Sequence, residues 1–370
     1  MANKITKENK LFTLICLLVS ALFLQAAQSQ EQTVSWKEAQ RQDIAWYGSE
    51  EAIRIAENVL LYQHSNGGWL KNIAMAGVLG EKEKQVLREE KSKEIGTTID
   101  NGATHTQLRY LAKVYSQTQK DDYRQSFLKG VDYLLEAQYK NGGWPQFFPL
   151  KEGYYEHITF NDNAMMGVMF LFSDILNRKK FAFVDTAIKE KIRESIEKGE
   201  EVILKMQIRI DGKPTLWCAQ HHSKDLSPAK ARSYELPSLS GSESVGIVKY
   251  LMTIENPSQK VITAVKSAVA WFEKHKIEGK NLVYIDAPEL EGGKDRVVVK
   301  DEKADPLWAR FNEIGTGRPM FVGRDGVVED SLEKIAHERR MGYSYLGNYA
   351  NDLLNEAYPN WLKRISYENH

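Results

Sequence analysis

Apolar residues recur every three or four positions through several long stretches of this chain, the spacing of one buried helix face. Ala52, Ile53, Ala56, Val59 and Leu60 form the first of these faces. The same periodicity predicts further helices within residues 108–115, 127–135, 163–176, 184–206, 245–254, 261–273, 332–338 and 345–365. We therefore expect a mostly helical protein.

Segments without this periodicity separate the helices. Residues 80–96 are highly charged and predict a solvated helix or loop. Residues 211–240 contain three prolines and two histidines, and residues 306–326 are rich in glycine and arginine, so both predict long irregular loops. Short strands are expected at residues 281–288 and 296–300. Strands and helices do not alternate along the chain, so a parallel sheet is not predicted.

Two of the predicted helices end in the same sequence. Residues 66–69 and 141–144 both read Asn-Gly-Gly-Trp, and Trp69 and Trp144 are 75 positions apart. Trp217, 73 positions further on, predicts a weaker third copy. A repeat of this length holds two long helices, so we expect stacked helical hairpins in an all-α (α/α) toroid with long loops and a few short strands. Gly-Gly suits the end of a helix, and we expect most of these tryptophans to pack there rather than to stack on a sugar.

The first residues predict a secretory signal. Lys4, Lys7 and Lys10 precede an uncharged apolar run, and Ala26 and Ala27 follow it. The run is too short for a stable membrane span, and an uncleaved anchor is the alternative. We expect residues 1–29 to be removed and residues 30–370 to form one domain. The mature protein is then exported to the periplasm or the extracellular space and has no membrane span.

The overall charge gives no reason to expect nucleic acid as a partner. The chain balances 50 basic against 50 acidic residues, and removal of residues 1–29 leaves a formal charge of −2. A local basic cluster must therefore bind any anionic ligand. Cys218 is the one cysteine outside the signal, so no intrachain disulfide is expected. We expect a monomer.

Asp100-Asn101 and Asp162-Asn163 are the first candidates for chemistry. Each pair follows an apolar residue and precedes small residues and a helical pattern. The simplest role of such a pair is to cap the first free amides of a helix. Both pairs precede helices of the same expected toroid, so we expect them together at one end of the bundle. Two carboxylates with amide oxygens could bind calcium, or could serve as the acid and base of a glycosidase.

Arginines in the two irregular loops are the second candidates. Arg232 lies in the loop at residues 230–243, and Arg310, Arg318 and Arg324 lie within fifteen residues among several glycines. Guanidinium groups bind carboxylates through two parallel hydrogen bonds. Four arginines in two such loops favour a polyanionic substrate. In an exported chain of neutral charge, an acidic polysaccharide fits better than nucleic acid.

Zinc and a cysteine nucleophile are less favoured. His221 and His222 lie near Cys218 and Asp225, but adjacent histidines in one loop match no known zinc-ligand spacing. Nothing near Cys218 in the sequence marks an activating base. We expect the two histidines to be polar loop residues that line the binding cleft.

Five motifs, in this order, resemble the pectate lyases of polysaccharide lyase family 10. They read NGGWPQFFP at residues 141–149, ITFNDNAM at 158–165, ARSYELPSLSG at 231–241, WARFNEIGTGRP at 308–319 and GRDGVV at 323–328. The resemblance extends from about Trp46 to Tyr349. Two positions depart from the family pattern, with His222 in place of aspartate and Asn312 in place of tyrosine.

The resemblance implies an α/α toroid that cleaves polygalacturonate by calcium-dependent β-elimination. It implies that Asp100 and Asp162 belong to the calcium site, that Arg232 is the catalytic base, and that Arg310 and Arg324 bind the carboxylates of the substrate. We add neighbouring residues as further candidates for binding polygalacturonate or oligogalacturonides, namely Asn101, Asn163 and Arg318. Calcium is the expected cofactor.

These residue types suit elimination from a uronate. The proton on carbon 5 is acidic because it lies next to the carboxylate, and cations on that carboxylate stabilise the enolate-like intermediate. A base removes the proton, and the glycosidic oxygen leaves from carbon 4. An arginine base conflicts with its usual pKa above about 12, and neighbouring cations in a dehydrated cleft reduce the conflict.

Two other functions stay open at this point. A toroidal glycoside hydrolase would use Asp100 and Asp162 as acid and base, would need no calcium, and would form no double bond. A non-catalytic pectin-binding protein would keep affinity for oligogalacturonides without forming any product. Few carboxylates are available, so we expect a weak calcium site that a substrate carboxylate completes.

Overall fold

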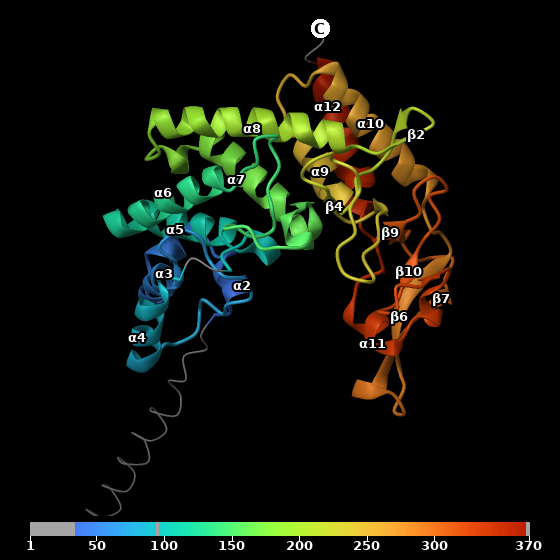
Figure 1. Cartoon of the computed structure of the whole chain (residues 1–370), viewed down its shortest axis with the longest axis horizontal. Coiled ribbons are helices and arrows are strands. Elements are labelled where there is room, and N and C mark those ends of the chain that lie inside the picture. Colours follow the sequence, from blue (N-terminus) through green and yellow to red (C-terminus); the bar gives the residue numbers. More distant parts are fainter. Residues whose placement is uncertain (1–33, 94–95, 368–370) are drawn as a thin grey trace, which may run out of the picture.

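The computed structural model describes residues 34–93 and 96–367, so the predicted signal at residues 1–29 lies outside the described part of the chain. Eleven α-helices fall within the described residues (Figure 1). They are α2 (Trp36–Ala39), α3 (Glu50–Tyr62), α4 (Glu81–Glu90), α5 (His105–Thr118), α6 (Asp121–Glu136), α7 (Ala164–Asn177), α8 (Thr186–Met206), α9 (Glu243–Leu251), α10 (Gln259–Lys274), α11 (His337–Gly342) and α12 (Tyr358–Tyr367).

The strands are short and form two-stranded antiparallel pairs, in the order β1–β4, β2–β3, β5–β9, β6–β7, β8–β12 and β10–β11. They are β1 (Ile158–Thr159), β2 (Arg209–Ile210), β3 (Lys213–Pro214), β4 (Gln220–His221), β5 (Leu239–Ser240), β6 (Lys280–Asp286), β7 (Lys294–Lys300), β8 (Trp308–Ala309), β9 (Phe311–Asn312), β10 (Phe321–Val322), β11 (Val328–Glu329) and β12 (Leu346–Gly347).

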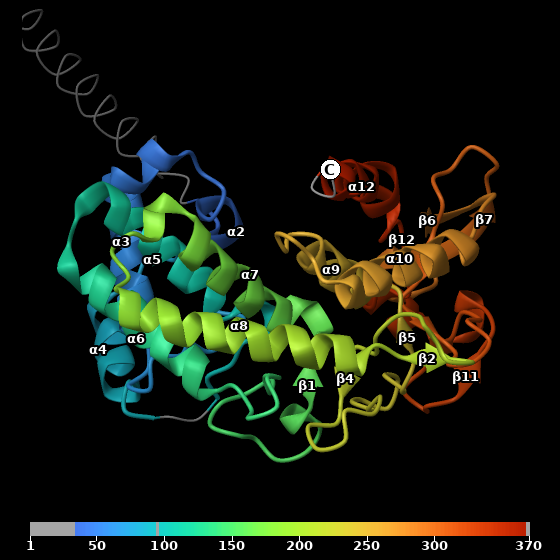
Figure 2. The same ribbon diagram turned by 90° about the horizontal axis from the view of Figure 1, so that it is seen from above.

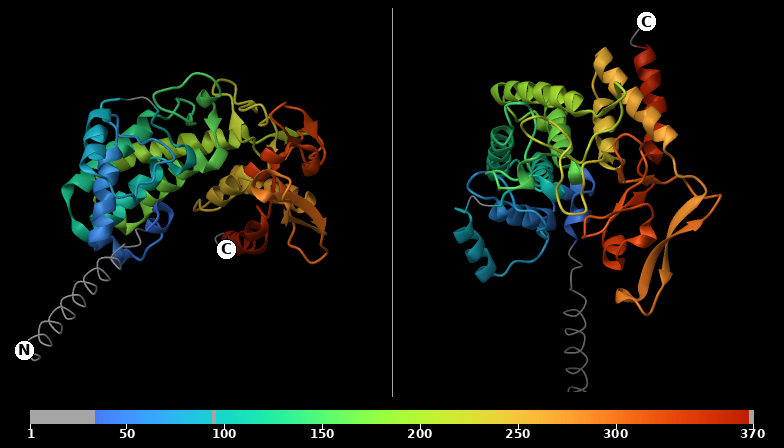
Figure 3. Two further views of the ribbon diagram at one scale, coloured as in Figure 1. Left: turned by 90° about the horizontal axis from the view of Figure 1, so that it is seen from below. Right: turned by 45° about the vertical axis from the view of Figure 1, so that its right-hand side comes forward.

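One apolar core joins α2, α3, the helices from α5 to α10, and α12, and a second, smaller core lies among the C-terminal strands and loops. Helices α3 to α7 lie in one half of the molecule, helices α9, α10 and α12 lie in the other, and α8 runs between them (Figure 2). This confirms the predicted helical class with a few short strands. The helices follow a curve in Figure 3, and the closed toroid stays a prediction.

A tryptophan anchors the end of each of the four helices α3, α6, α8 and α10. Each indole ring is buried, and its N–H donates to a carbonyl in the last turn of its helix, where carbonyls lack the usual helical donor. The four bonds run from Trp69 to Val59 (2.8 Å), Trp144 to Leu134 (2.7 Å), Trp217 to Ile203 (2.7 Å) and Trp308 to Phe272 (2.9 Å). The expected structural role of the tryptophans is confirmed, and Trp308 is a fourth copy that the sequence did not predict.

The fourth copy was hidden by an insertion. In the first two copies the tryptophan follows its carbonyl partner by ten positions, whereas Trp308 follows Phe272 by 36. The β6–β7 hairpin fills this interval and projects from the molecule (Figure 1). Bridge pairing between Ile277 and Leu307 closes its base, so the chain returns to the anchor position after the hairpin.

The second helix of each hairpin packs against its neighbours in the series. Helix α5 contacts α7, α7 contacts α9, and α9 contacts the π-helical turn Leu353–Ala357 that leads into α12. The starts of α5, α7 and α9 therefore lie near one another, each directly after an anchoring tryptophan and a loop. This arrangement places the predicted Asp-Asn turns side by side.

Two helix predictions near the C-terminus are confirmed only in part. Residues 345–365 do not form one helix, because β12 pairs with β8 and the helical turns begin only after residue 350. Residues 332–338 contain a short 3-10 turn, Leu332–Lys334, and the start of α11. The charged segment does form a solvated helix, since α4 buries none of its residues.

No helix among the described residues has the length and the apolar character that crossing a membrane requires.

Replacing Trp144 with phenylalanine tests the anchor. The change leaves the Leu134 carbonyl buried without its donor, and we expect the free energy of unfolding in urea to fall by about 1–3 kcal/mol or more. Trp46→Phe is the matched control, because the partly buried Trp46 ring packs on Tyr47 and its N–H makes no hydrogen bond among the described residues. Equal losses in both variants would contradict the anchoring role.

Candidate active site

Two 3-10 turns with the same backbone geometry begin the site. Asp100–Gly102 precedes α5, and Asn161–Asn163 precedes α7. The second residue of each turn is left-handed, with φ of 49° at Asn101 and 51° at Asp162, and the third also has a positive φ. Asparagine, aspartate and glycine tolerate this conformation better than other residues.

This geometry corrects the register that we expected for the two Asp-Asn pairs. Asp100 is structurally equivalent to Asn161, and Asn101 is equivalent to Asp162. The two carboxylates therefore occupy different positions of the repeated turn. The two Asp-Asn pairs look alike in sequence, but they are offset by one position in the repeated turn.

Asp100 is buried and already has three donors. Its Oδ1 accepts from the backbone N–H of Asn101 at 3.0 Å, and its Oδ2 accepts from the Gln146 side chain at 2.6 Å. Lys71 forms an ion pair with the same Oδ2. The negative charge of Asp100 is thus compensated within the protein.

Arg310 joins the second turn to the start of α9. Its Nη2 donates to Asn161 Oδ1 at 2.9 Å and to Glu243 Oε1 at 2.5 Å, and it lies 3.5 Å from Asp162 Oδ1. The guanidinium is largely buried, and its carbon lies 4.7 Å from the centre of the Tyr343 ring. Ser240 donates to the other oxygen of Glu243. A charge buried in this way must be paired, and Glu243 supplies the pairing.

Asp162 is the more accessible of the two aspartates. Its side chain is 41% exposed, and its Oδ2 accepts from the Asn161 amide at 2.7 Å. Partial burial raises the pKa of Asp162, and the carboxylates of Glu243 and Asp100 raise it further, whereas Arg310 opposes the shift. An added cation beside this carboxylate would therefore be favourable.

Arg232 is held by a buried carboxylate. Its Nε and Nη2 donate to the two oxygens of Glu235 at 2.8 and 2.9 Å. The Tyr343 hydroxyl donates to the same Glu235 at 2.6 Å. Burial alone would lower the pKa of Arg232, but the bonds and the charge of Glu235 outweigh it and raise the pKa above its ordinary value. Arg232 is consequently a cation in this arrangement.

Arg324 belongs to the same cluster, and Arg318 does not. Arg324 donates to Glu338 at 2.7 Å, and its guanidinium lies 5.8 Å from the Tyr234 ring, on which Arg232 also lies at 5.3 Å. Arg318 is 76% exposed and bonds to Glu313 within its own loop. The structure thus brings together three of the four predicted arginines.

The two predicted asparagines lie at the edges of the turns. The Asn101 amide donates to Asn72 at 3.0 Å. Asn163 lines a cavity of about 220 Å³ together with Asp162, Glu243 and Arg310.

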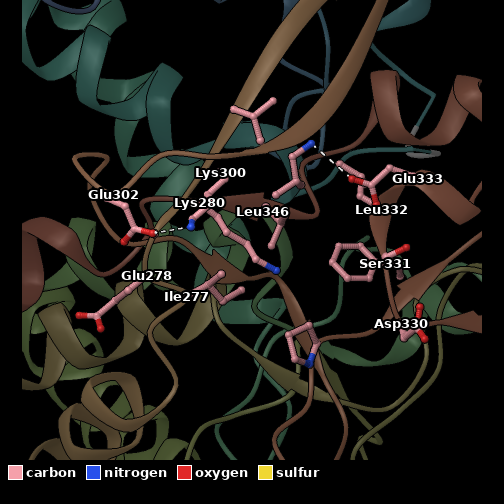
Figure 4. Close-up of a pocket in the computed structure, with 15 residues that line it drawn as sticks. Ile277, Glu278, Lys280, Lys300, Glu302, Asp330, Ser331, Leu332, Glu333 and Leu346 are labelled. Carbon is pink, nitrogen blue, oxygen red and sulfur yellow. Dashed lines mark hydrogen bonds and ion pairs between the residues drawn. The ribbon is translucent and has the colours of Figure 1, made fainter.

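A second cavity of about 640 Å³ lies beneath the β6–β7 hairpin, where Lys280, Leu332 and Leu346 line it and no predicted site residue reaches it (Figure 4). The smaller cavity is the one that holds the candidate chemistry.

Comparison with known proteins gives a consistent result. Residues 63–354 match the family described as pectic acid lyase. The chain belongs to this family. Two solved structures of a family 10 polysaccharide lyase from Cellvibrio cellulosa, one of them a mutant in complex with trigalacturonic acid, are each 34% identical to it with a TM-score of 0.73. Each alignment covers 85% of this chain. It covers 95% of the mutant's chain and 94% of the other structure's chain. None of the curated proteins matches.

The chain is therefore a pectate lyase, and the resemblance to family 10 is confirmed. We set aside the glycoside hydrolase and the non-catalytic binding protein. The roles of the individual site residues stay predictions. The structure identifies the side chains that each of these residues contacts.

His221 and Cys218 are internal to their loop, whereas His222 is exposed. His221 is buried, with Nε2 3.1 Å from the Cys218 amide and Nδ1 2.8 Å from the Leu226 carbonyl. Burial lowers the pKa of His221 to about 4, so both ring nitrogens serve the loop as a neutral imidazole. His222 packs edge-on against His157 at 4.7 Å. Asn312 is also internal, and its amide donates to the Leu239 and Ala309 carbonyls.

Sequence analysis did not identify the glutamates of the site. Glu235, Glu243 and Glu338 each hold one of the three arginines, and none was a candidate. The third copy of the repeat was a usable signal for Glu243, because it stands at the start of the helix that follows Trp217. Glu235 and Tyr343 are 108 positions apart and carry no such signal.

Asp162→Asn tests the electrostatics of the turn. The folded state raises the pKa of Asp162, so folding favours the protonated carboxyl. As pH rises from the unfolded pKa through the folded pKa, the carboxyl ionises and the protein loses stability. We expect a higher melting temperature for the amide variant at pH 7. The difference should shrink as pH falls and the wild-type carboxyl takes up its proton. A wild type that is more stable than the variant at pH 7 would contradict this.

Proposed function

We propose that this pectate lyase cleaves polygalacturonate and oligogalacturonides by calcium-assisted β-elimination. The observation that carries the proposal is the convergence of Arg232, Arg310 and Arg324 around the Tyr234 and Tyr343 rings, beside the Asp162 turn. Such a cluster suits a substrate that carries one carboxylate per sugar. The trigalacturonic acid bound by the similar enzyme supports the same ligand class.

The proposed roles follow from the partners of each arginine. Arg310 and Arg324 bind the carboxylate of the reacting uronate, which stabilises the charge that develops when carbon 5 loses its proton. Arg232 takes that proton, a double bond forms between carbons 4 and 5, and the bond from carbon 4 to the glycosidic oxygen breaks. Solvent then supplies a proton to the leaving oxygen. Asn101 and Asn163 contact the sugar hydroxyl groups.

The donors of the two turns suit calcium in type and fall short in number. Asp162 and Asp100 offer carboxylates and Asn161 and Asn163 offer amide oxygens, but the described residues hold no group of three or more histidine, cysteine, aspartate or glutamate side chains placed for a metal. Calcium takes six to eight oxygens, so water and a substrate carboxylate must complete its shell. When bound, it would supply positive charge to the reacting carboxylate.

Asp162 is the main protein ligand in this proposal. Asp100 already holds Lys71 and Gln146, and it must exchange Lys71 before it can contact a metal. Asp162 has an accessible carboxylate with a raised pKa, so a cation there relieves an existing penalty. We propose a site that binds calcium weakly without substrate.

The role of Arg232 as base requires a neutral guanidine. Glu235 favours the cation, whereas the neighbouring Arg324 and a metal at Asp162 favour loss of the proton. We propose that substrate binding removes water from the cleft, and that this desolvation, which disfavours the guanidinium cation, shifts the balance toward the neutral guanidine. We also propose that the enzyme is a monomeric toroid that acts outside the cytoplasm, because its substrate class is an external polysaccharide.

The reaction type is tested on polygalacturonate with and without calcium. Elimination gives an unsaturated uronide, so we expect ultraviolet absorbance to rise with time. A chelator should abolish the rise, and added calcium should restore it. New reducing ends without absorbance would contradict elimination, and full activity in the chelator would contradict the metal.

Replacing Arg232 with lysine tests the assigned base. Lysine keeps a positive charge but loses the paired bonds to Glu235, and we expect kcat/KM to fall by about 100-fold or more. Arg193→Lys is the matched control, since Arg193 pairs with a glutamate on the exposed surface of α8. Near-normal turnover by the Arg232 variant would overturn the assignment. Arg318→Ala, assayed in parallel, shows whether the exposed loop contacts substrate.

A further inference from the structure

Most cations near the site already have a carboxylate partner. Arg232, Arg310 and Arg324 hold Glu235, Glu243 and Glu338, and Lys71 holds Asp100. A substrate carboxylate that reaches one of these groups must share it with a protein carboxylate. A cation without a carboxylate partner can bind the carboxylate of a uronate more favourably, because no existing ion pair is weakened.

Lys151 is a cation of this kind. Its side chain is exposed and makes no ion pair with a carboxylate among the described residues. Two aromatic rings support it, with Nζ 4.2 Å from the centre of Tyr155 and 5.2 Å from the centre of Phe147. Attraction between the ammonium and the ring faces holds the charge in place before any ligand arrives.

The rings themselves are fixed to the site. Phe147 and Tyr155 pack edge to face at 5.2 Å, and Tyr154 lies against Tyr155 at 4.0 Å. Bridge pairing between Thr98 and Phe147 ties this loop to the segment that enters the Asp100 turn. The residue before Phe147 donates to Asp100 itself.

Lys71 connects this loop to the candidate active site. It pairs with Asp100, and its Nζ lies 5.6 Å from the Phe147 ring. The hydrogen bond from Tyr154 lowers the pKa of Tyr155, and the charges of Lys151 and Lys71 add to the effect. Lys71 and Lys151 both lie over the Phe147 ring, so the loop extends from the Asp100 turn to Lys151.

We propose that Lys151, Tyr155 and Phe147 form a further uronate subsite, which binds a galacturonate residue of the chain outside the reacting pair. The ammonium of Lys151 binds the carboxylate of that sugar, and the partly exposed ring of Tyr155, which packs on the buried Phe147, supports its apolar face. This inference rests on the proposed function, because it assumes a polyuronate in the adjacent cleft.

Lys151→Met tests the subsite, because methionine keeps an unbranched chain and removes the charge. With hexagalacturonate we expect KM to rise by about 3- to 10-fold while kcat changes little, as for the loss of one exposed ion pair. With trigalacturonate the rise should be smaller. High salt should reduce the difference between wild type and variant.

Lys300→Met is the control, because Lys300 is an exposed lysine on β7 in the cavity of Figure 4, away from the candidate site. It removes the same charge and should leave KM unchanged. Tyr155→Ala should raise KM in the same way as Lys151→Met, and Tyr155→Phe, which keeps the ring, should have a smaller effect. Equal KM values for the Lys151 and Lys300 variants at both chain lengths would overturn the proposal.

Direct binding separates this inference from the proposed function. Calorimetry with hexagalacturonate needs no turnover, so it applies even if the wild type forms no unsaturated product. Weaker binding by Lys151→Met than by Lys300→Met supports the subsite in either case. Equal binding rejects the subsite and leaves elimination to the ultraviolet assay. If Lys151→Met melts at a lower temperature than wild type, Lys151→Gln decides the result.

Discussion

The buried guanidinium of Arg310 is the contact on which the site depends. It follows the fourth anchoring tryptophan, and it binds Asn161 from the turn before α7 and Glu243 from the start of α9. One group therefore joins three successive helical hairpins at their inner ends. Its positive charge is buried, so each acceptor must stay in place for the charge to be tolerated. Because Asn161 must stay bonded to Arg310, the next residue, Asp162, is also held beside the guanidinium.

Much of the architecture could be predicted from local pattern. The spacing of apolar residues identified α3, α5, α6, α7, α8, α9 and α10, and the Asn-Gly-Gly-Trp copies identified two of the four anchors. These signals are local because a helix face and a helix end are each encoded within a few residues. The helix expected from residue 345 begins only after residue 350, because β12 at its start pairs with a strand almost forty residues earlier in the chain.

The sequence suggested residue types for the candidate site but not the contacts between them. Motifs identified the aspartates and arginines, but the glutamate partners are set by packing between distant segments, with Arg310 and Glu243 67 positions apart. The register of the two turns was equally hidden, because backbone handedness at Asn101 and Asp162 is not visible in a comparison of letters. In the folded protein the arginines are paired before substrate arrives. If these arginines bind the substrate as proposed, recognition would be an exchange of carboxylate partners, which favours selectivity over tight binding.

The closed base of the β6–β7 hairpin has a consequence for how this chain can vary. Ile277 and Leu307 hold the two ends of the hairpin segment together, and Trp308 reaches its helix regardless of what lies between. The hairpin is thus a position where the length of the chain can change without disturbing the repeat. A foreign module grafted at its tip would be carried by the scaffold, on a projection that shares no residue with the candidate site.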